Sequence, residues 1–434
     1  MKTFSFIILS FFSLASYSQD SLLTLQDAIK YTLQHNYGVL ISKDVAEIAK
    51  IQNSWGAAGA LPTFGITGQK VIGTNNIQQK LSNGNETNST NAATQNFTAG
   101  FAVGWRVFDG FKMFATKRRL EELERIGQYS FIKTANETVY RVAQNYYNMV
   151  KLLQQLKASA GQLDLYRERL KIADARFRLG SAAKNDLLQA EVDLNNQVAD
   201  SINFLNQVQV AKDTLSDLMG FTPDRSYRVV DTITLNALPP LPDIKAKIDA
   251  QNPDLKIARA NITVLQEAKK EINSQRLPVV TINGTYNFVR TNNAAGFTLL
   301  NQTYGPAASI GVAIPLFSGL VVRNELKVAD IQLKDQNLVI SQLNNTIDKN
   351  IAISFSNYKN ALAIVNLEQA NLNLSQENIF IATQRFKELN ITSVELRQVQ
   401  ISYNDAQNRL YNALYQAKLA EIEIALLTGE ITRL

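Results

Sequence analysis

The residue types that carry out most enzymatic and metal chemistry are almost missing from this sequence. It has no cysteine and a single histidine, His35. The chain therefore has no disulfide framework, no thiolate metal site and no cysteine nucleophile. One histidine leaves no cluster of imidazole ligands and little scope for histidine acid–base catalysis. Walker A, Gly-x-Ser-x-Gly and metal-ligand spacings are also missing, so a carboxylate pair is the one enzymatic option left open. We expect no enzyme, no cofactor and no metal site.

The charged residues are few and nearly balanced. The 44 Lys and Arg residues oppose 38 Asp and Glu residues, which leaves a net charge of +6 spread along 434 residues. A nucleic-acid-binding protein gathers positive charge on one face, so no nucleic-acid partner is expected. The charged fraction of 19% is below the usual quarter, which predicts a polar but weakly charged surface. Length alone would predict about three domains.

The N-terminus predicts export. Lys2 precedes an apolar run over residues 4–14, and small and polar residues follow up to Gln19. This pattern is typical of a secretory signal peptide, here residues 1–18. A membrane anchor is the alternative, but the run is shorter than the roughly 20 apolar residues that a spanning helix needs.

The remaining chain contains an internal duplication. Leu277-Pro278 repeats Leu61-Pro62 and Asn252 repeats Asn36 at an offset of 216; further on, Phe386 repeats Phe177 and Gly429 repeats Gly220 at an offset of 209. Such self-similarity defines the units of the fold. We predict repeat 1 at 19–220, a proline-containing connector at 221–242 and repeat 2 at 243–434. Each repeat should contain an opening helix, a strand, a polar loop, a second strand and a long helical hairpin.

Long helices are indicated by the missing helix breakers. No proline occurs from 63 to 222 or from 316 to the end. We predict opening helices from Leu25 to about 58 and from Ile244 to about 275. The long helices are expected at about 111–179, 183–219, 320–389 and 393–428, with Gly220 a C-cap. Apolar residues seven apart favour coiled-coil-like packing, although a helical-bundle core would show the same stripe. The stripe is Val142, Met149, Leu156, Leu163, Leu170 and Phe177, repeated as Ile351, Tyr358, Val365, Leu372, Ile379 and Phe386.

Four segments alternate apolar with polar or small residues. They lie at about 63–72, 96–107, 279–290 and 306–316. Their length suits tilted transmembrane strands, and a soluble antiparallel sheet would look similar. The Asn- and Thr-rich segments 73–96 and 291–304 are expected to be solvated loops. Because transmembrane barrels begin at about eight strands, a membrane location would require several copies of the chain.

In its order and spacing of motifs, the chain from about 22 to 429 resembles the TolC-like outer-membrane efflux proteins. The motifs are residues 23–29 with Asn36, Asn252-Pro253, the Leu-Pro pair before each hairpin, residues 314–319, and residues 176–180 leading into 186–191. The resemblance implies a mainly α fold with a transmembrane β-barrel part. It also implies a homotrimer, with a twelve-stranded barrel in outer-membrane lipid and a twelve-helix α-barrel in the periplasm. Such proteins are passive exit ducts that receive substrates from a periplasmic adaptor and an inner-membrane pump.

The resemblance also assigns functional residues near the tips of the long hairpins. At the periplasmic aperture, Glu395 matches an acidic ring, Asp186 is its equivalent in repeat 1, and Gln398 replaces a second acid. The family's tyrosine and arginine lock positions are occupied by Phe386 and Ile391, and Phe386 and Arg385 are the tip-lock candidates. The adaptor-contacting tips are Leu179, Gly180, Ser181, Leu389, Asn390, Ile391 and Thr392.

Two alternatives stay open at this point. Glu395 and Asp186 stand where first-turn acids are favoured by the helix dipole, whereas acidic rings at a constriction select cations. The whole protein could also be a non-conducting structural or adhesive coiled-coil protein of the outer membrane and periplasm. The transported substrate is not indicated by any motif.

Overall fold

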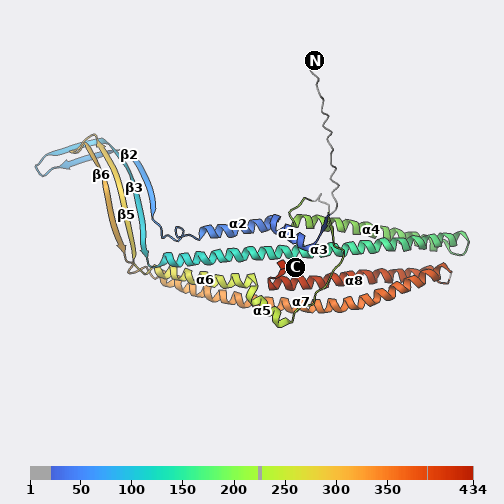
Figure 1. Ribbon diagram of the computed structural model, residues 1–434. Helices are drawn as coiled ribbons and strands as arrows, with labels where there is room; N and C mark the ends of the chain where they lie inside the picture. Colours follow the sequence, from blue (N-terminus) through green and yellow to red (C-terminus); the bar gives the residue numbers. More distant parts are fainter. Residues whose placement is uncertain (1–20, 223–226, 389, 434) are drawn as a thin grey trace, which may run out of the picture. The chain divides into compact units, whose positions relative to one another are not determined.

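The computed structural model describes residues 21–222, 227–388 and 390–433. The predicted signal peptide lies outside them. The chain divides into two compact units (Figure 1). The first contains the described residues up to Ser42, Ile132–Asn252 and Asn345–Leu434, and the second contains Lys43–Phe131 and Pro253–Asn344. Each unit therefore takes segments from both predicted repeats.

The first unit is built mainly from helices that lie side by side (Figure 1). Within the described residues, no helix is long and apolar enough to cross a membrane. A short parallel pair, β1 (Ser21–Leu23) and β4 (Tyr227–Val229), accompanies them. The helices are α1 (Leu25–His35), α2 (Tyr37–Gln52, shared with the second unit), α3 (Lys112–Arg178, shared), α4 (Lys184–Leu218), α5 (Leu241–Gln251), α7 (Val321–Lys387, shared), α8 (Ser393–Thr428) and the 3₁₀ turn Ile431–Arg433.

The seven-residue stripe forms the core of these helices. In repeat 2, Ile351, Tyr358, Ile379 and Phe386 are buried, and the two residues between them are half-buried. In repeat 1 burial decreases along α3 until Phe177, which is 38% exposed. Burying one stripe along each helix is how coiled-coil-like pairs are stabilised. Phe177 and Phe386 are thus equivalent in sequence but not in packing.

The single opening helix predicted for each repeat was wrong, because each is broken at its repeated asparagine. Asn36 separates α1 from α2, and Asn252 separates α5 from α6 (Pro253–Ser274). The Asn36 amide donates to the carbonyl of Leu218 at 3.0 Å, and the Asn252 amide donates to that of Leu427 at 3.1 Å. Each asparagine therefore satisfies a carbonyl that the end of a long helix leaves without a partner.

Glycine is required where the long helices end against these breaks. Gly220 has φ 72°, and a Cβ there would lie 2.6 Å from the carbonyl oxygen of His35. Gly429, its repeat equivalent, has φ 73° and faces Gln251. Left-handed backbone at a helix C-terminus favours glycine. The predicted end of the helix at Gly220 is confirmed, with Met219 as the C-cap residue and Gly220 as the left-handed residue that follows it.

The connector between the repeats crosses all four long helices of the first unit. The Tyr227 hydroxyl donates to the Lys212 carbonyl of α4 at 2.8 Å. The backbone amide of Val230 donates to the Tyr146 hydroxyl of α3 at 3.3 Å. Farther on, Asn236 donates to Glu421 of α8 and accepts from the Tyr358 hydroxyl of α7 at 2.8 Å. The connector ties the helices of both hairpins together on one face.

The second unit contains a four-stranded antiparallel sheet in the order β2-β3-β5-β6. The hairpins of the two repeats are joined through β3 and β5, so β2 and β6 are the two edges. An exposed strand edge leaves backbone groups that another strand can pair with. The strands are β2 (Thr63–Lys80), β3 (Glu86–Asp109), β5 (Val279–Asn293) and β6 (Leu300–Ala313).

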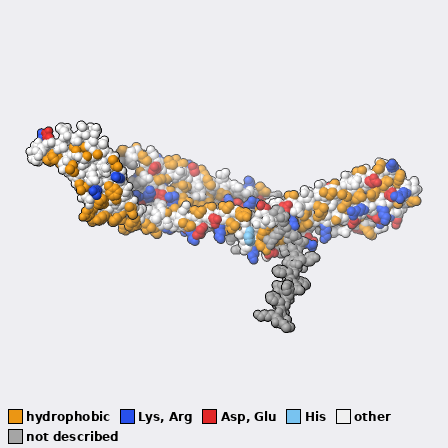
Figure 2. Space-filling view, turned by 90° about the horizontal axis from the view of Figure 1, so that it is seen from above, with side chains coloured by type: hydrophobic (Ala, Val, Ile, Leu, Met, Phe, Trp, Pro, Cys, Tyr) orange, Lys and Arg blue, Asp and Glu red, His pale blue; other side chains and the backbone are white. Residues whose placement is uncertain are grey.

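The register places unlike side chains on the two faces of this sheet. On one face Ile66 pairs with Phe101, which pairs with Tyr286 and stacks on its ring at a centroid distance of 5.7 Å. Much of this face is solvent-exposed, with Ile66 88% and Ile310 74% exposed. Figure 2 shows hydrophobic side chains gathered on the sheet away from its hairpin end at the far left. The opposite face carries small and polar residues, including Thr67, Gly100, Asn287 and Gly305 in one row across the four strands.

The predicted strands were too short at their outer ends. Residues 73–96 were expected to form a loop, yet β2 and β3 continue as a paired hairpin whose turn is residues 81–85. Likewise β5 extends to Asn293 and β6 begins at Leu300, before the predicted 306. The Asn- and Thr-rich composition of these outer ends therefore indicated exposure to solvent and not the end of strand pairing. β6 stops at Ala313, two residues before Pro315, which cannot donate to a ladder.

Candidate functional site

The two hairpin tips have similar backbones and different surroundings. At the first tip, the amide of Ser181 donates to the Arg176 carbonyl at 2.9 Å and Gly180 has φ 71°. At the second, the equivalent amide of Asn390 donates to the Arg385 carbonyl at 2.9 Å. Three of the predicted adaptor-contacting residues, Leu179 (82% exposed), Gly180 and Ser181, are exposed at the first tip.

At the second tip the predicted adaptor-contacting residues divide. Asn390 and Thr392 are exposed, whereas Ile391 is half-buried and packs on a small core that includes Phe386 and Leu396. Leu389 lies outside the described residues. The first tip therefore exposes the apolar side chain of Leu179, whereas the apolar side chain of Ile391 at the second tip packs inward.

Glu395 is exposed and starts helix α8 through a reciprocal cap. Its carboxylate accepts from the amide of Thr392 at 2.8 Å, and its own amide donates to the Thr392 hydroxyl at 3.2 Å. The hydrogen bonds from Thr392 hold the pKa of Glu395 below its ordinary value. Charged Glu395 is thus held at a fixed position, with the carboxylate still open to solvent.

Asp186 occupies the equivalent place in α4 without such a cap. The N-cap there is Ala183, which makes no side-chain hydrogen bond. Gln398 is exposed one turn beyond Glu395, on the same side of α8 because residues three apart are neighbours on a helix. No hydrogen bond or ion pair joins Asp186 to Glu395 or Gln398 in the described part of the chain. Glu395 and Gln398 therefore share one face of α8, whereas Asp186 belongs to α4.

Phe386 is buried and contacts Arg176 of α3. The Arg176 guanidinium lies over the Phe386 ring at 4.2 Å, and its Nη2 donates to the Phe386 carbonyl at 2.6 Å. Burial lowers the pKa of Arg176, and the charge of Asp186 opposes that shift. Arg385 is exposed, although its charge helps to lower the pKa of Glu395. Arg176 is the repeat equivalent of Arg385, and it joins the two hairpins.

A buried polar cluster near the tips was not found from the sequence. Arg169, with a side chain 1% exposed, donates to Asp193 at 2.8 Å, and Arg397 donates to the same carboxylate at 3.1 Å. Arg169 also donates to the Ser393 hydroxyl at 3.2 Å and to the Gln400 side chain at 3.4 Å. The cluster links α3, α4 and α8. Its position in repeat 2 is taken by Asn378 and Ser402, so the duplication gave no signal for it.

The fold, with one exposed apolar sheet face and two long helical hairpins, is similar to that of solved outer-membrane channels. The solved outer-membrane channel OprN has a TM-score of 0.78 and 16% identity, with 94% of this chain and 90% of that chain covered. The Campylobacter jejuni CmeC outer membrane channel has a TM-score of 0.79 and 14% identity, covering 94% of this chain and 85% of that one. These likenesses confirm the predicted fold class.

Sequence comparison leads to the same family. The outer membrane protein TolC of Escherichia coli (strain K12) is 18% identical over 358 residues, which are 80% of this chain and 71% of that protein. The family described as "Outer membrane efflux protein" matches residues 53–221 and 246–430, which are well over half of the chain. The chain belongs to this outer membrane efflux protein family.

Proposed function

We propose that three copies of this chain form an exit duct of the outer membrane, which passively conducts substrates delivered by a periplasmic adaptor and an inner-membrane pump. The observation that carries the proposal is the four-stranded sheet with two open edges and one exposed apolar face. Exposure of apolar side chains such as Ile66 and Ile310 to water is unfavourable, and these side chains are suited to contact with lipid. The small and polar opposite face suits a water-filled interior.

Closing the sheet requires further copies. Four strands are too few, because transmembrane barrels begin at about eight. A cyclic assembly in which β6 of one copy pairs with β2 of the next leaves no open edge. The resemblance to TolC-like proteins selects three copies, and therefore twelve strands.

The helices offer faces for the same assembly. On α4, Ile202 is 60% and Leu205 is 55% exposed; on α7, Leu367 and Leu374 are 60% and 66% exposed and lie seven residues apart. Exposed apolar stripes of this kind mark contacts with partners. In a ring of copies, α4 of one chain would contact α7 of its neighbour.

The number of copies is measured directly by the mass of the purified mature protein in detergent or nanodiscs. We expect a particle that contains three chains. A monodisperse monomer would contradict the proposal, because a monomer would expose both sheet edges and both helical stripes.

Site residues at the tips follow from this proposal. The exposed Leu179, Gly180 and Ser181, together with Asn390 and Thr392, would contact the adaptor. Glu395 and Gln398, with Asp186, would line the periplasmic aperture. Phe386 would hold the tip closed through its contact with Arg176 and not with Arg385, which is exposed.

The aperture role of Glu395 is tested by Glu395→Gln. Glutamine can replace glutamate in a capping box, so the start of α8 is preserved while the charge is lost. If Glu395 lines the constriction, multivalent cations added to the reconstituted channel should block its current less strongly, because acidic rings attract cations. The matched control is Asp164→Asn on the exposed surface of α3. Equal cation block in wild type and Glu395→Gln would assign the residue a capping role alone.

A further inference from the structure

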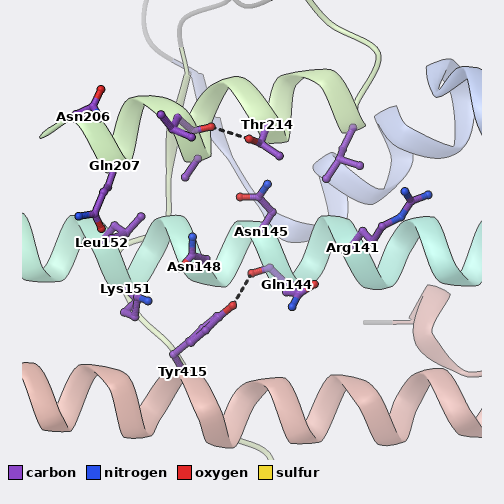
Figure 3. A pocket seen from close by; sticks show the side chains of 13 residues that line it. Arg141, Gln144, Asn145, Asn148, Lys151, Leu152, Asn206, Gln207, Thr214 and Tyr415 are labelled. Atoms are coloured by element: carbon purple, nitrogen blue, oxygen red, sulfur yellow. Dashed lines mark hydrogen bonds between the residues drawn. The ribbon is translucent and has the colours of Figure 1, made fainter. Parts of the chain in front are cut away.

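The first unit contains two cavities that are related by the internal repeat. One, of about 690 Å³, lies between α3 and α4 with Tyr415 of α8 at its side, and we call it the repeat-1 pocket (Figure 3). The other, of about 510 Å³, lies between α7 and α8 with Tyr140 of α3 at its side, and we call it the repeat-2 pocket. At the offset of 209, seven lining positions coincide: 148, 151, 152, 207, 210, 211 and 214 in the first, and 357, 360, 361, 416, 419, 420 and 423 in the second.

Two of the seven shared positions are amides in both pockets, three are apolar in both, and the charged residues differ. Asn148 and Gln207 recur as Asn357 and Gln416. In the repeat-2 pocket, Glu423 stands where the repeat-1 pocket has Thr214, and its Arg409 is already paired with Glu368 at 2.8 Å. The repeat-1 pocket is lined by Arg141 and Lys151 and by no carboxylate. Only the repeat-1 pocket has a positive charge that its own lining leaves uncompensated.

Both cations of the repeat-1 pocket lack an acidic partner in the described part of the chain. Arg141 donates to the Thr138 hydroxyl at 3.3 Å, which is a neutral acceptor. Lys151 lies 4.7 Å from the centre of the Tyr415 ring, beside which Figure 3 shows it. Partial burial lowers the pKa of Lys151. A partly desolvated cation gains most from an anionic ligand, and the amides between the two cations supply further donors.

The connector identifies which side of the helices these pockets face. On each long helix, a connector-contacting residue is followed two positions later by a pocket residue: Tyr146 and Asn148, Lys212 and Thr214, Tyr358 and Asn360, Glu421 and Glu423. Two residues correspond to about 200° around an α-helix. The pockets therefore lie on the face opposite the connector.

In a duct, this face is the bore. A connector that crosses all four long helices would obstruct the passage if it were inside, so it belongs outside. This step rests on the proposed function. The repeat-1 and repeat-2 pockets then alternate around the inner wall, three of each in a trimer.

We propose that the repeat-1 pocket is a binding site on the bore wall for solutes that carry an oxyanion group, such as a phosphate, sulfate or carboxylate. Arg141 and Lys151 attract the anionic group. The amides of Gln144, Asn145 and Asn148 donate hydrogen bonds to it and to the polar body of the solute. The two cations are ten residues apart on α3, or about 15 Å, so the pocket accepts an elongated or polyvalent anion.

Binding is tested by calorimetry with inorganic tripolyphosphate and the trimer of the purified mature protein. This measurement does not depend on conduction. We expect one ion bound per chain, with Lys151→Gln and Arg141→Gln each weakening binding about two- to fivefold and the double variant about tenfold, the range of partly exposed charge pairs.

The matched control for binding is Lys157→Gln. It removes the same charge from α3 on the connector side, where Lys157 is 84% exposed and lies 3.9 Å from Asp231. Unchanged binding in the control and weakened binding in the pocket variants would support the proposal. Equal affinities in all four variants and wild type, or an equal loss in the control, would overturn it.

The location of the pocket is tested separately with single cysteines, because the chain has none of its own. Asn148→Cys and Lys157→Cys trimers are reconstituted and exposed to a small anionic methanethiosulfonate reagent. Modification should lower the single-channel current of Asn148→Cys and leave that of Lys157→Cys unchanged. A conducting Asn148→Cys channel whose labelled form carries full current would contradict the bore location, whereas a folded trimer with no current at all would contradict the proposed function itself.

Discussion

Arg169 is a charged side chain near the tips that is almost completely buried. It is buried with Asp193, and its Nε has no hydrogen-bond partner among the residues that the structure describes. Removing one member of a buried ion pair leaves the other charge uncompensated and typically costs 3–5 kcal/mol. Here Arg397 would still contact Asp193, which should reduce the cost.

Arg169→Leu should therefore destabilise the protein by about 3 kcal/mol, at the lower end of that range. The measurement is the shift of the denaturant midpoint of unfolding. Arg167→Leu is the control, because Arg167 makes only an exposed pair with Asp164, and such pairs contribute about 1 kcal/mol or less. Equal shifts for the two variants would show that the Arg169 cluster adds nothing to stability.

Glu368 provides a pH-dependent contact between α7 and α8. It accepts from Arg409 at 2.8 Å and from Asn371 at 3.3 Å, and the Arg409 hydrogen bond lowers its pKa from the ordinary value of 4.5. Asp405 is the other charged group that acts on Arg409. A carboxyl with a lowered folded pKa stabilises the fold above its unfolded pKa, and the effect is lost as pH falls through the folded pKa.

Glu368→Gln should consequently melt at a lower temperature than wild type at pH 7, and the difference should shrink as the pH falls below 4.5. Thermal unfolding followed by circular dichroism between pH 7 and pH 3 measures this. A difference that is the same at both ends of the range would exclude the ion pair as its cause.

Some of these residues could be predicted from the sequence and others could not, for physical reasons. Glu395 could be placed at a helix start because first-turn acids are favoured by the helix dipole, which is a local rule. The buried position of Arg169 could not be predicted, because a charged residue inside a long helix is expected to be exposed unless its partners are known. Its partners Asp193 and Gln400 come from other helices. The resemblance suggested Arg385 as a tip-lock candidate, and the structure places its repeat equivalent Arg176 against Phe386.

At the scale of elements, the two return helices begin differently. Helix α8 starts with the reciprocal cap of Thr392 and Glu395, whereas the N-cap of α4 is Ala183 with Asp186 three residues on. Introducing a threonine at 183 would complete the same motif. An N-cap hydroxyl contributes about 1 kcal/mol.

Thr392→Ala should loosen the first turn of α8 by about 1 kcal/mol, and Ala183→Thr should stabilise that of α4 by a similar amount. Hydrogen exchange of the amides in each first turn measures both effects in the same protein. Faster exchange at α8 with no slowing at α4 would mean that the backbone of the first tip does not permit the cap.

The lengths of the elements show what the pattern could predict. The long helices were predicted to within about two residues because proline is absent over their whole length and a seven-residue stripe runs along the second halves of α3 and α7. The strands were predicted from alternation of apolar residues, which covers only their inner parts. Their polar outer ends, 73–80 and 86–95, pair as well as the apolar parts, because backbone hydrogen bonding does not depend on side-chain polarity. The breaks at Asn36 and Asn252 depend on carbonyls of α4 and α8 and have no local helix-breaking signal in the first repeat.

At the scale of the whole molecule, the duplication explains both the fold and its incompleteness. Each repeat supplies one strand hairpin and one helical hairpin, and the two repeats together still leave open the edges β2 and β6. The repeat also separates roles between equivalent residues. Phe386 is buried and Phe177 exposed, and Arg141 and Lys151 leave the repeat-1 pocket positive where the repeat-2 pocket contains Glu423.

The central claim is that the assembled chain is an open route through the outer membrane. The most direct measurement is the current through single particles of the purified mature protein in a planar bilayer, with three chains per particle verified by mass. The account predicts uniform current steps whose block by multivalent cations is weakened in Glu395→Gln. A correctly folded trimer that inserts into the bilayer and carries no current would contradict it.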